Sequence, residues 1–180
     1  MRFLTGKNLY LRPLLANDVT EDYISWLNDP ETSKYSMRRF LPNNEFQARK
    51  YLSTRASNDV ILAICTKDGK HIGNIKFGPI DWINKTAEVS ILLGDRSQWG
   101  KGYSREAIYL VTKHLFLTVG LNRIFAGTIN PAFTACVRKL GWKEEGLFRK
   151  GFFFDGKFLD IVRLSILKEE FREMPEFEEQ

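Results

Sequence analysis

Residues 88–107 read EVSILLGDRSQWGKGYSREA and decide how the rest of the chain is organised. The apolar residues between Val89 and Leu93 predict a short buried strand, which a Gly-Asp pair ends. Gly100 and Gly102 follow, and their missing Cβ atoms let the backbone turn sharply and approach a ligand closely. Apolar residues then recur at helical spacing, at Ala107, Ile108, Val111, Leu115 and Val119. The stretch therefore predicts a strand, a tight glycine turn and a long helix.

This arrangement has a chemical consequence at the start of the helix. The first helical turn exposes unpaired N–H groups and carries the positive end of the helix dipole. A glycine turn adds further N–H groups to the same concavity, where phosphate oxygens bind readily. The glycine spacing does not match a P-loop, and a Rossmann fingerprint is excluded because position 105 is Arg where it needs Gly. The residues alone predict a phosphate or pyrophosphate site, with a purely structural turn as the alternative.

Length and composition predict one soluble domain. The chain has 180 residues, of which 43% are hydrophobic and 27% charged, as in globular proteins with a real core. No apolar run approaches the roughly 20 residues that span a bilayer. The first residues also lack the charged-then-apolar order of a secretory signal. We therefore expect a cytoplasmic protein with no membrane partner.

The cysteines, histidines and charges exclude two further classes of function. Cys65 and Cys136 have no metal-ligand spacing, and His71 and His114 lie far apart in the sequence, so we expect no metal. The formal net charge is +5, but the basic residues are scattered and the C-terminal end is acidic. We expect no nucleic-acid partner and a mild attraction for anionic small molecules.

Periodicity and turn residues predict the remaining elements. We expect strands at 8–12, 60–65, 71–80, 86–93, 121–129, 143–153 and 157–166. We expect helices from Asn17 or Asp18 to about 28, from Asn43 or Asn44 to about 54, after the glycine turn, and from Pro131 to Gly141 with Asn130 as its cap. Asp155-Gly156 predicts a hairpin turn. The order predicts one mixed α/β domain over 1–180, with its core at about 7–168 and a frayed acidic tail at 169–180.

The residues of the glycine turn resemble a known family. The run Gln98–Ala107, QWGKGYSREA, resembles the acetyl-CoA loop of the bacterial GNAT N-acetyltransferases, in particular the RimJ/RimL-type branch. The later runs LNRI at 121–124 and KLGWKEEG at 139–146 resemble the second motif of the same branch. The resemblance covers nearly the whole chain. It implies the GNAT fold, with a central mixed, mostly antiparallel sheet flanked by helices.

The resemblance also implies a cofactor and its site. The strand ending at Leu93 is expected to splay from the strand at 121–129, and acetyl-CoA is expected to bind in that cleft, with no metal. The expected acetyl-CoA residues are Ile91, Leu92, Leu93, Gln98, Trp99, Gly100, Lys101, Gly102, Tyr103, Ser104, Asn130 and Phe133. The expected reaction is direct transfer of the acetyl group to an amine.

Three positions depart from the family pattern. Ser97 stands at the first position of the loop, where relatives carry Gln or Arg. Phe133 replaces a common Ser, and Val137 replaces the tyrosine that many relatives use as general acid. The adjacent Cys136 is interpreted as a small buried hydrophobe. The family's usual proton donor is therefore missing.

Glu88 is the candidate catalytic base. It lies on the strand that leads to the cofactor, and a base assists because free alkyl amines are mostly protonated at neutral pH. The alternative is a surface glutamate paired with Lys85 or Lys76. A main-chain N–H near Leu92 is the expected oxyanion donor.

The acceptor side is basic and aromatic. Residues 31–43 form either a loop that packs its own aromatic residues or a lid over the substrate. The expected acceptor-binding residues are Tyr35, Arg38, Trp82 and Phe153. Residues 71–80 resemble the corresponding strand of bacterial GNATs that modify amino sugars, which favours a small amine such as a nucleotide-linked amino sugar.

Two other functions stay open. One is acetylation of protein N-termini, and the other is a non-catalytic acyl-CoA-binding module. The sequence leaves open whether the protein is a monomer or a homodimer.

Overall fold

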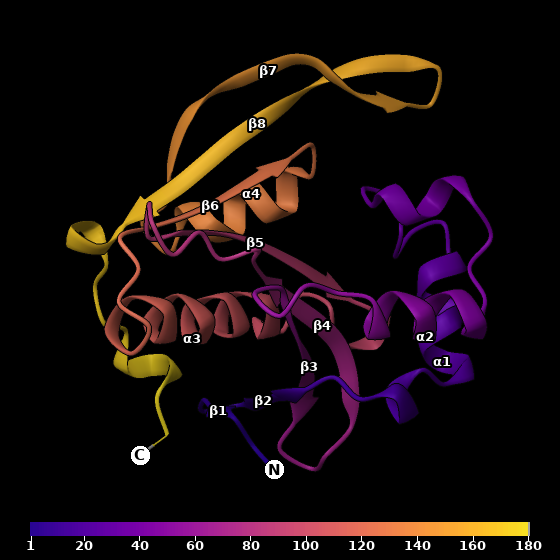
Figure 1. Cartoon of the computed structure of the whole chain (residues 1–180), viewed down its shortest axis with the longest axis horizontal. Helices are drawn as coiled ribbons and strands as arrows, with labels where there is room; N and C mark the ends of the chain where they lie inside the picture. The colour runs from indigo at the N-terminus through magenta and orange to yellow at the C-terminus, as the bar shows by residue number, and fades with distance from the viewer. Residues whose placement is uncertain (180) are drawn as a thin grey trace.

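In the part of the chain that the structure describes, eight strands form one sheet in the order β1-β2-β3-β4-β5-β6-β8-β7 (Figure 1). The computed structural model describes residues 1–179. All neighbouring strands pair antiparallel except β5 and β6, which pair in parallel. The strands are β1 Leu4–Thr5, β2 Leu9–Pro13, β3 Val60–Thr66, β4 His71–Phe77, β5 Thr86–Leu93, β6 Arg123–Thr128, β7 Lys143–Phe154 and β8 Lys157–Leu167.

Four α-helices and several single 3-10 turns connect the strands. The α-helices are α1 Glu21–Asn28, α2 Glu45–Ser53, α3 Tyr103–Leu117 and α4 Pro131–Arg138. The 3-10 turns are η1 Ala16–Asp18, η2 Met37–Phe40, η3 Arg96–Gln98, η4 Lys168–Glu170 and η5 Pro175–Phe177. The helix α3 runs beside the central strands, and the long β7–β8 hairpin projects beyond them (Figure 1). These elements confirm the predicted GNAT fold in a single mixed α/β domain.

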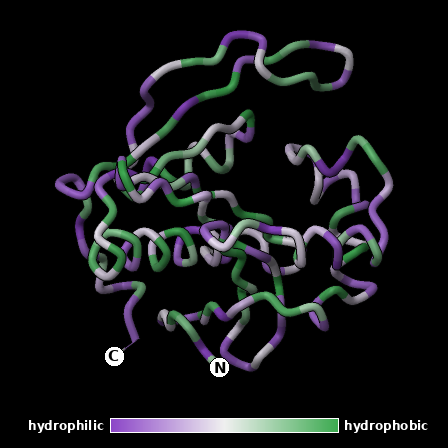
Figure 2. Tube along the Cα trace, viewed as in Figure 1, coloured by the Kyte–Doolittle hydropathy of each residue, from purple (hydrophilic) through white to green (hydrophobic). Residues whose placement is uncertain are grey.

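The core divides into two clusters, one on each side of the sheet. The larger one joins α3 and α4 to the inner strands, and Ile108, Leu115 and Ile124 are completely buried in it. The smaller one joins α1 and α2 to β3 around Tyr23 and Ala63. Apolar residues accordingly concentrate along α3 and the central strands (Figure 2). Because side chains alternate along a strand, β5 contributes Val89 to the larger cluster and Leu92 to the smaller one.

The parallel pairing of β5 and β6 stops early. Thr86, Ala87 and Glu88 pair with residues 123–125 of β6, and no pairing continues from there to the end of either strand. Both strands extend further, β5 to Leu93 and β6 to Thr128. The predicted splay between these two strands is therefore confirmed.

Several local predictions require correction. The first α-helix is capped by Thr20, whose side chain accepts a hydrogen bond from the Tyr23 N–H, whereas Asn17 and Asp18 belong to η1. The fourth strand ends at Phe77, before a Gly-Pro pair that cannot continue the ladder. The two-residue strand β1 was not predicted, because two residues carry no periodicity.

The acidic C-terminal segment packs on the core instead of fraying. Phe177 is buried, and its ring lies 5.2 Å from that of Tyr109 on α3. Phe171 lies 5.8 Å from the same ring. Lys113 forms ion pairs with Glu173 and Glu178. The prediction of a frayed tail is therefore wrong, because it rested on the acidic residues and did not include the packing of Phe171 and Phe177 on Tyr109.

This packing predicts a stability effect for Phe177→Ala. Removing a buried phenyl ring leaves a cavity, and we expect the free energy of unfolding to fall by about 3 kcal/mol. Phe46→Ala is the matched control, since Phe46 is 74% exposed. Urea unfolding followed by circular dichroism measures both variants. A tail that frays would leave Phe177→Ala as stable as the control.

Candidate active site

The turn before α3 presents a row of unpaired backbone donors. Gly100 and Gly102 have φ angles of +77° and +88°, which glycine adopts without strain. The first helical hydrogen bond of α3 runs from the Glu106 N–H to the Gly102 carbonyl. Within residues 1–179, the N–H groups of residues 100–105 make no hydrogen bond. This row of donors at a helix N-terminus suits a pyrophosphate.

The structure narrows the set of donors that the sequence predicted. The N–H groups of Gln98 and Trp99 already donate to the carbonyls of Asp95 and Arg96, at 3.0 and 3.1 Å. These bonds close η3, so neither N–H group is available to a ligand. Lys101 is exposed, and its ammonium group lies 3.1 Å from the Gln98 side-chain oxygen. The available main-chain donors therefore begin at Gly100.

Asp95 fixes the start of the turn. Its carboxylate accepts hydrogen bonds from the Ser97 N–H at 2.9 Å and the Ser97 hydroxyl at 2.6 Å. It also lies 2.6 Å from the Lys70 ammonium group. Burial alone would raise the pKa of Asp95, but Lys70 and Ser97 outweigh it and hold the pKa at about 2. Asp95 therefore stays ionised at neutral pH and holds the turn in place.

Two tryptophans hold the turn against the sheet. The Trp99 indole N–H donates to the Leu93 carbonyl at 2.8 Å, which ties the turn to the end of β5. Trp26 of α1 lies against Gly94, where an added Cβ would come within 2.1 Å of the indole. These contacts position the row of donors at the open end of the cleft.

The main chain of β5 alternates between β4 and the cleft. The Gly78 N–H donates to the Glu88 carbonyl, and the Gly94 N–H donates to the Ile72 carbonyl, both at 2.9 Å. Main-chain groups alternate in direction along a strand, so those of Leu92, which pairs with Asn74, also face β4. The Leu92 N–H itself is therefore not available as an oxyanion donor, and the donor expected near Leu92 must belong to one of its neighbours.

The neighbours of Leu92 take its place at the cleft. By the same alternation, the main chains of Ile91 and Leu93 face the cleft. The Leu93 carbonyl is used by Trp99, which leaves the N–H groups of both residues available there.

The start of α4 forms the other wall of the cleft. The Asn130 side chain caps this helix by accepting a hydrogen bond from the Ala132 N–H at 2.9 Å. Phe133 is half-buried against the main core cluster. Val137 is completely buried, and burial raises the pKa of the neighbouring Cys136 thiol. This helix thus supplies packing and no charged proton donor.

Glu88 lies at the last paired position before the two strands separate, opposite Phe125. Its carboxylate is 44% exposed, and Arg163 of β8 approaches it to 3.9 Å. Neither lysine named as an alternative partner pairs with it, since Lys76 binds Asp59 and Lys85 lies over the Trp82 ring. A half-exposed carboxylate at the point where the two strands begin to separate can accept a proton from an incoming amine.

The segment around η2 reaches the tip of the β7–β8 hairpin. Arg39 forms an ion pair with Asp155 at 2.5 Å, and its guanidinium lies 4.5 Å from the centre of the Phe154 ring. Tyr35 stacks on the same ring at 5.9 Å. Phe40 lies 6.3 Å from Phe152. The predicted irregular segment 31–43 thus bridges to the hairpin.

The structure does not bring all four predicted acceptor residues together. Tyr35 lies in the bridge, whereas Arg38 turns away from Arg39 and lies over Tyr51 of α2. Phe152 and Phe154 contact the η2 segment. Because side chains alternate along β7, Phe153 points to the opposite face, where it contacts Phe158. Trp82 lies in the turn before β5, at the paired end of β5 and β6.

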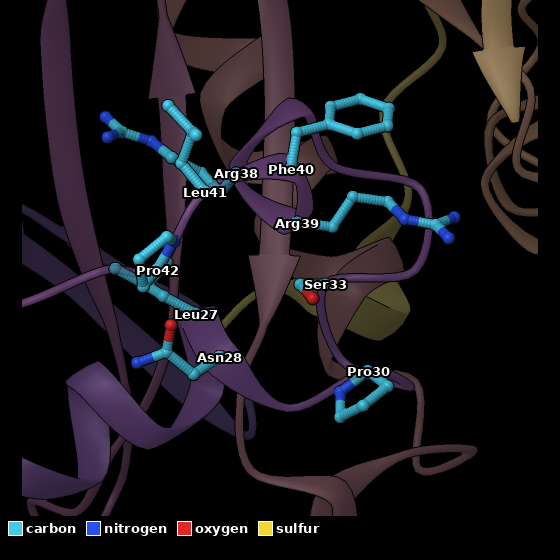
Figure 3. Close-up of a pocket in the computed structure, with 9 residues that line it drawn as sticks. All are labelled: Leu27, Asn28, Pro30, Ser33, Arg38, Arg39, Phe40, Leu41 and Pro42. Atoms are coloured by element: carbon cyan, nitrogen blue, oxygen red, sulfur yellow. The ribbon is translucent and has the colours of Figure 1, made fainter.

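Two surface hollows flank this region. One of about 400 Å³ lies beneath η2, and in it Arg38 and Arg39 extend in opposite directions (Figure 3). The other, of about 690 Å³, lies at a bulge of β7. Its lining residues are Phe148, Arg149, Lys150 and Asp160. Arginine or lysine side chains therefore line both hollows.

Comparison with known proteins identifies the family. The acetyltransferase (GNAT) domain family matches residues 8–143. The chain belongs to the GNAT acetyltransferases. Members of this family use acetyl-CoA, and the splayed strands and unpaired N–H groups described above fit that molecule. Within residues 1–179 no three His, Cys, Asp or Glu residues are placed to hold a metal ion, and no helix is long and apolar enough to cross a membrane.

The relatives of this GNAT enzyme have names that describe different activities. An uncharacterized N-acetyltransferase, p20, of Bacillus licheniformis is 30% identical over 95% of this chain and 99% of its own length. Spermidine N(1)-acetyltransferase of Vibrio cholerae is 28% identical over 56% of this chain and 58% of its own. A crystal structure of spermidine N-acetyltransferase from Vibrio cholerae, in complex with CoA and spermine, shares the fold. Its TM-score is 0.79 at 22% identity, over 91% of this chain and 97% of that one.

Sequence reasoning missed three residues of this region. Phe152 and Phe154 differ from the predicted Phe153 only in the face of β7 that they occupy, and three consecutive phenylalanines give no signal for that choice. Arg163 is one of many scattered basic residues. The sequence signal that could have pointed to Arg163 was a pair of glycines, Gly127 and Gly146, which lie opposite it on the two neighbouring strands.

Trp99→Phe tests how the turn is held. This change keeps an aromatic ring but removes the hydrogen bond to Leu93, so we expect CoA affinity to fall about fivefold, the value of one net hydrogen bond. Trp82→Phe is the control, because Trp82 is exposed and lies at the other end of β5. Isothermal calorimetry with CoA measures both. Equal affinities for Trp99→Phe and wild type would show that the indole does not position the donors.

Proposed function

We propose that this GNAT enzyme acetylates the primary amine of a small molecule that carries anionic groups, such as a nucleotide-linked amino sugar. The observation that supports this acceptor is the charge around Glu88 and the hairpin. The four basic residues there, Arg39, Arg149, Lys150 and Arg163, outnumber the three acidic ones, Glu88, Asp155 and Asp160. Such a surface attracts anions.

The cofactor would be held mostly by main-chain groups. The N–H groups of residues 100–105 would bind the pyrophosphate, and the cleft-facing main chains of Ile91 and Leu93 would bind the pantetheine arm. The Asn130 side-chain nitrogen, Nδ2, makes no hydrogen bond within residues 1–179, so it remains available at the wall of the cleft. Bound acetyl-CoA supplies the acetyl group as an activated thioester.

The chain's own residues would then handle the proton and the charge. Glu88 would accept the proton of the attacking amine, directly or through one water molecule. The Ile91 and Leu93 N–H groups would stabilise negative charge that develops at the mouth of the cleft. Val137 is completely buried and apolar, so no side chain at that position acts as the general acid that many family members have there.

A polyamine acceptor fits this surface poorly. Spermidine and spermine are polycations, and they would meet a face on which basic residues outnumber carboxylates even after Arg39 and Arg163 are paired with Asp155 and Glu88. The similarity to spermidine acetyltransferases therefore supports the fold and the use of CoA more than the acceptor.

A protein N-terminus is the second candidate acceptor. Two observations favour it: the motifs resemble the RimJ/RimL-type branch, and the putative ribosomal N-acetyltransferase YdaF of Bacillus subtilis is 31% identical over 57% of both chains. The bridge between Arg39 and Asp155 argues against it, because an extended peptide needs a groove open at both ends.

A thiol-release assay with acetyl-CoA tests the proposal. The acceptor panel would contain nucleotide-linked amino sugars, spermidine and short peptides with free N-termini. We expect turnover with the anionic amines and at least tenfold lower kcat/KM with spermidine. Preferred turnover of peptides or spermidine would overturn the proposed acceptor, and no thiol release with any amine would overturn the catalytic role.

Glu88→Gln tests the proposed base. The amide keeps the shape of the side chain but cannot accept the proton, so we expect kcat to fall about 10²- to 10⁴-fold. CoA affinity should stay unchanged, because Glu88 lies apart from residues 100–105. Glu21→Gln on α1 is the control, since Glu21 is exposed. Wild-type turnover by Glu88→Gln at every pH would exclude this role.

A further inference from the structure

The guanidinium group of Arg163 lies close to two aromatic rings, one on each neighbouring strand. Its guanidinium carbon lies 4.8 Å from the centre of the Phe148 ring and 5.4 Å from that of Phe125. Cation–π contacts on two sides restrict where the side chain can point. The guanidinium group is therefore already ordered before any ligand arrives.

Two glycines make room for this arrangement. Arg163 pairs with Gly127 on β6 and with Gly146 on β7, so neither neighbouring strand places a side chain directly opposite it. A Cβ added to Gly127 would lie 2.4 Å from the Arg163 Nη1 atom. The guanidinium group thus lies directly over β6, on the side that leads to the cleft.

The donors of Arg163 are not used by the protein. Within residues 1–179 its guanidinium group makes no hydrogen bond, and its nearest anion is Glu88 at 3.9 Å. The side chain is 26% exposed, so it is partly removed from water yet reachable by a ligand. Five N–H donors in a rigid fork suit a carboxylate or a phosphate, which accept two parallel hydrogen bonds.

We propose that Arg163 binds an anionic group of the acceptor and thereby selects amines that carry a carboxylate or phosphate close to the amino group. This inference rests on the proposed function, because it takes the Glu88 face as the acceptor side. The Arg163 Nη1 and Glu88 Oε1 atoms lie 3.9 Å apart, so the amine and the anion of one acceptor must be separated by few bonds.

The reaction itself balances without any further reactant. A bond forms between the acceptor nitrogen and the acetyl carbon, and the bond between that carbon and the CoA sulfur breaks. The amine proton passes to Glu88, and CoA leaves as the thiolate with the electron pair of the broken bond, which then takes a proton from water or from Glu88. Arg163 takes no part in these bond changes, so it is a positioning residue that acts on specificity.

The experiment uses matched acceptors that differ in one anionic group. Phosphoethanolamine is compared with ethanolamine, and β-alanine with its amide, which also separates phosphate from carboxylate recognition. Binding is measured by NMR at the Arg163 side-chain Nε–H with CoA saturating the turn, so the result does not depend on turnover. Thiol release with acetyl-CoA then gives KM and kcat for the same four amines.

Three variants and one control test the residue. Arg163→Gln removes the charge, and Arg163→Lys keeps the charge but removes the fork. Gly127→Ala displaces the guanidinium group at a position with an ordinary φ angle. Arg172→Gln in the C-terminal segment is the control, since it removes the same charge from a side chain that bonds only local carbonyls.

We expect wild type and Arg172→Gln to bind one anionic amine of a pair at least tenfold tighter than its neutral partner. Arg163→Gln should raise KM for that anionic amine about 10- to 100-fold and for the neutral one less than threefold. Arg163→Lys and Gly127→Ala should lose part of the preference while CoA affinity stays unchanged.

The proposal is overturned if wild type shows no preference, or if Arg163→Gln keeps it. If Arg163→Gln does not fold, a preference that Arg163→Lys and Gly127→Ala retain in full overturns it. If no amine releases thiol, the proposed function fails, and the NMR binding data still decide whether Arg163 recognises the anion.

Discussion

The end of hydrogen bonding between β5 and β6 after Glu88 and Phe125 is the constraint on which the site depends. Buried main-chain groups need partners, and inner strands of a sheet normally supply them to each other. Here the two strands diverge, so Ile91 and Leu93 turn donors towards a gap at the point where the glycine turn begins. A cofactor with amide and phosphate groups can satisfy both sets of donors. The fold thus creates a binding site by leaving its own ladder incomplete.

The packing around the gap keeps it from closing. Trp26 against Gly94, and Trp99 bonded to Leu93, fix the turn at one end of β5. Just beyond the turn, Glu106 in the first turn of α3 is buried and accepts hydrogen bonds from the main chain of Asn8 and Leu9, which ties the start of the helix to β2. Because α3 is anchored along its length, its N-terminus stays directed at the cleft.

The sequence predicted what depends on local conformation. Positive φ angles at Gly100, Gly102 and Gly156 follow from glycine chemistry, and the turns at these places are where the sequence put them. The sequence could not predict the direction in which particular strand residues point. Whether Leu92 or Ile91 faces the cleft, and whether Phe153 or Phe154 faces η2, is decided by a register that only the neighbouring strands set.

The charge distribution on the acceptor side was likewise not predictable from the sequence. Arg163 is an ordinary basic residue in the sequence, and its surroundings depend on glycines 127 and 146, which the topology brings to either side of it. Relatives that share the fold act on polycations by their names, whereas this surface is basic. The fold therefore provides the cofactor site, and under the proposed function the hairpin and the η2 segment select the acceptor.

Backbone amide NMR during a titration with CoA tests the central claim most directly. The account predicts large shifts for the N–H resonances of residues 100–105, Ile91 and Leu93, with much smaller shifts for Gln98, Trp99 and Leu92, whose N–H groups are already bonded within the protein. Shifts concentrated elsewhere, or equal shifts at Leu92 and Ile91, would contradict it.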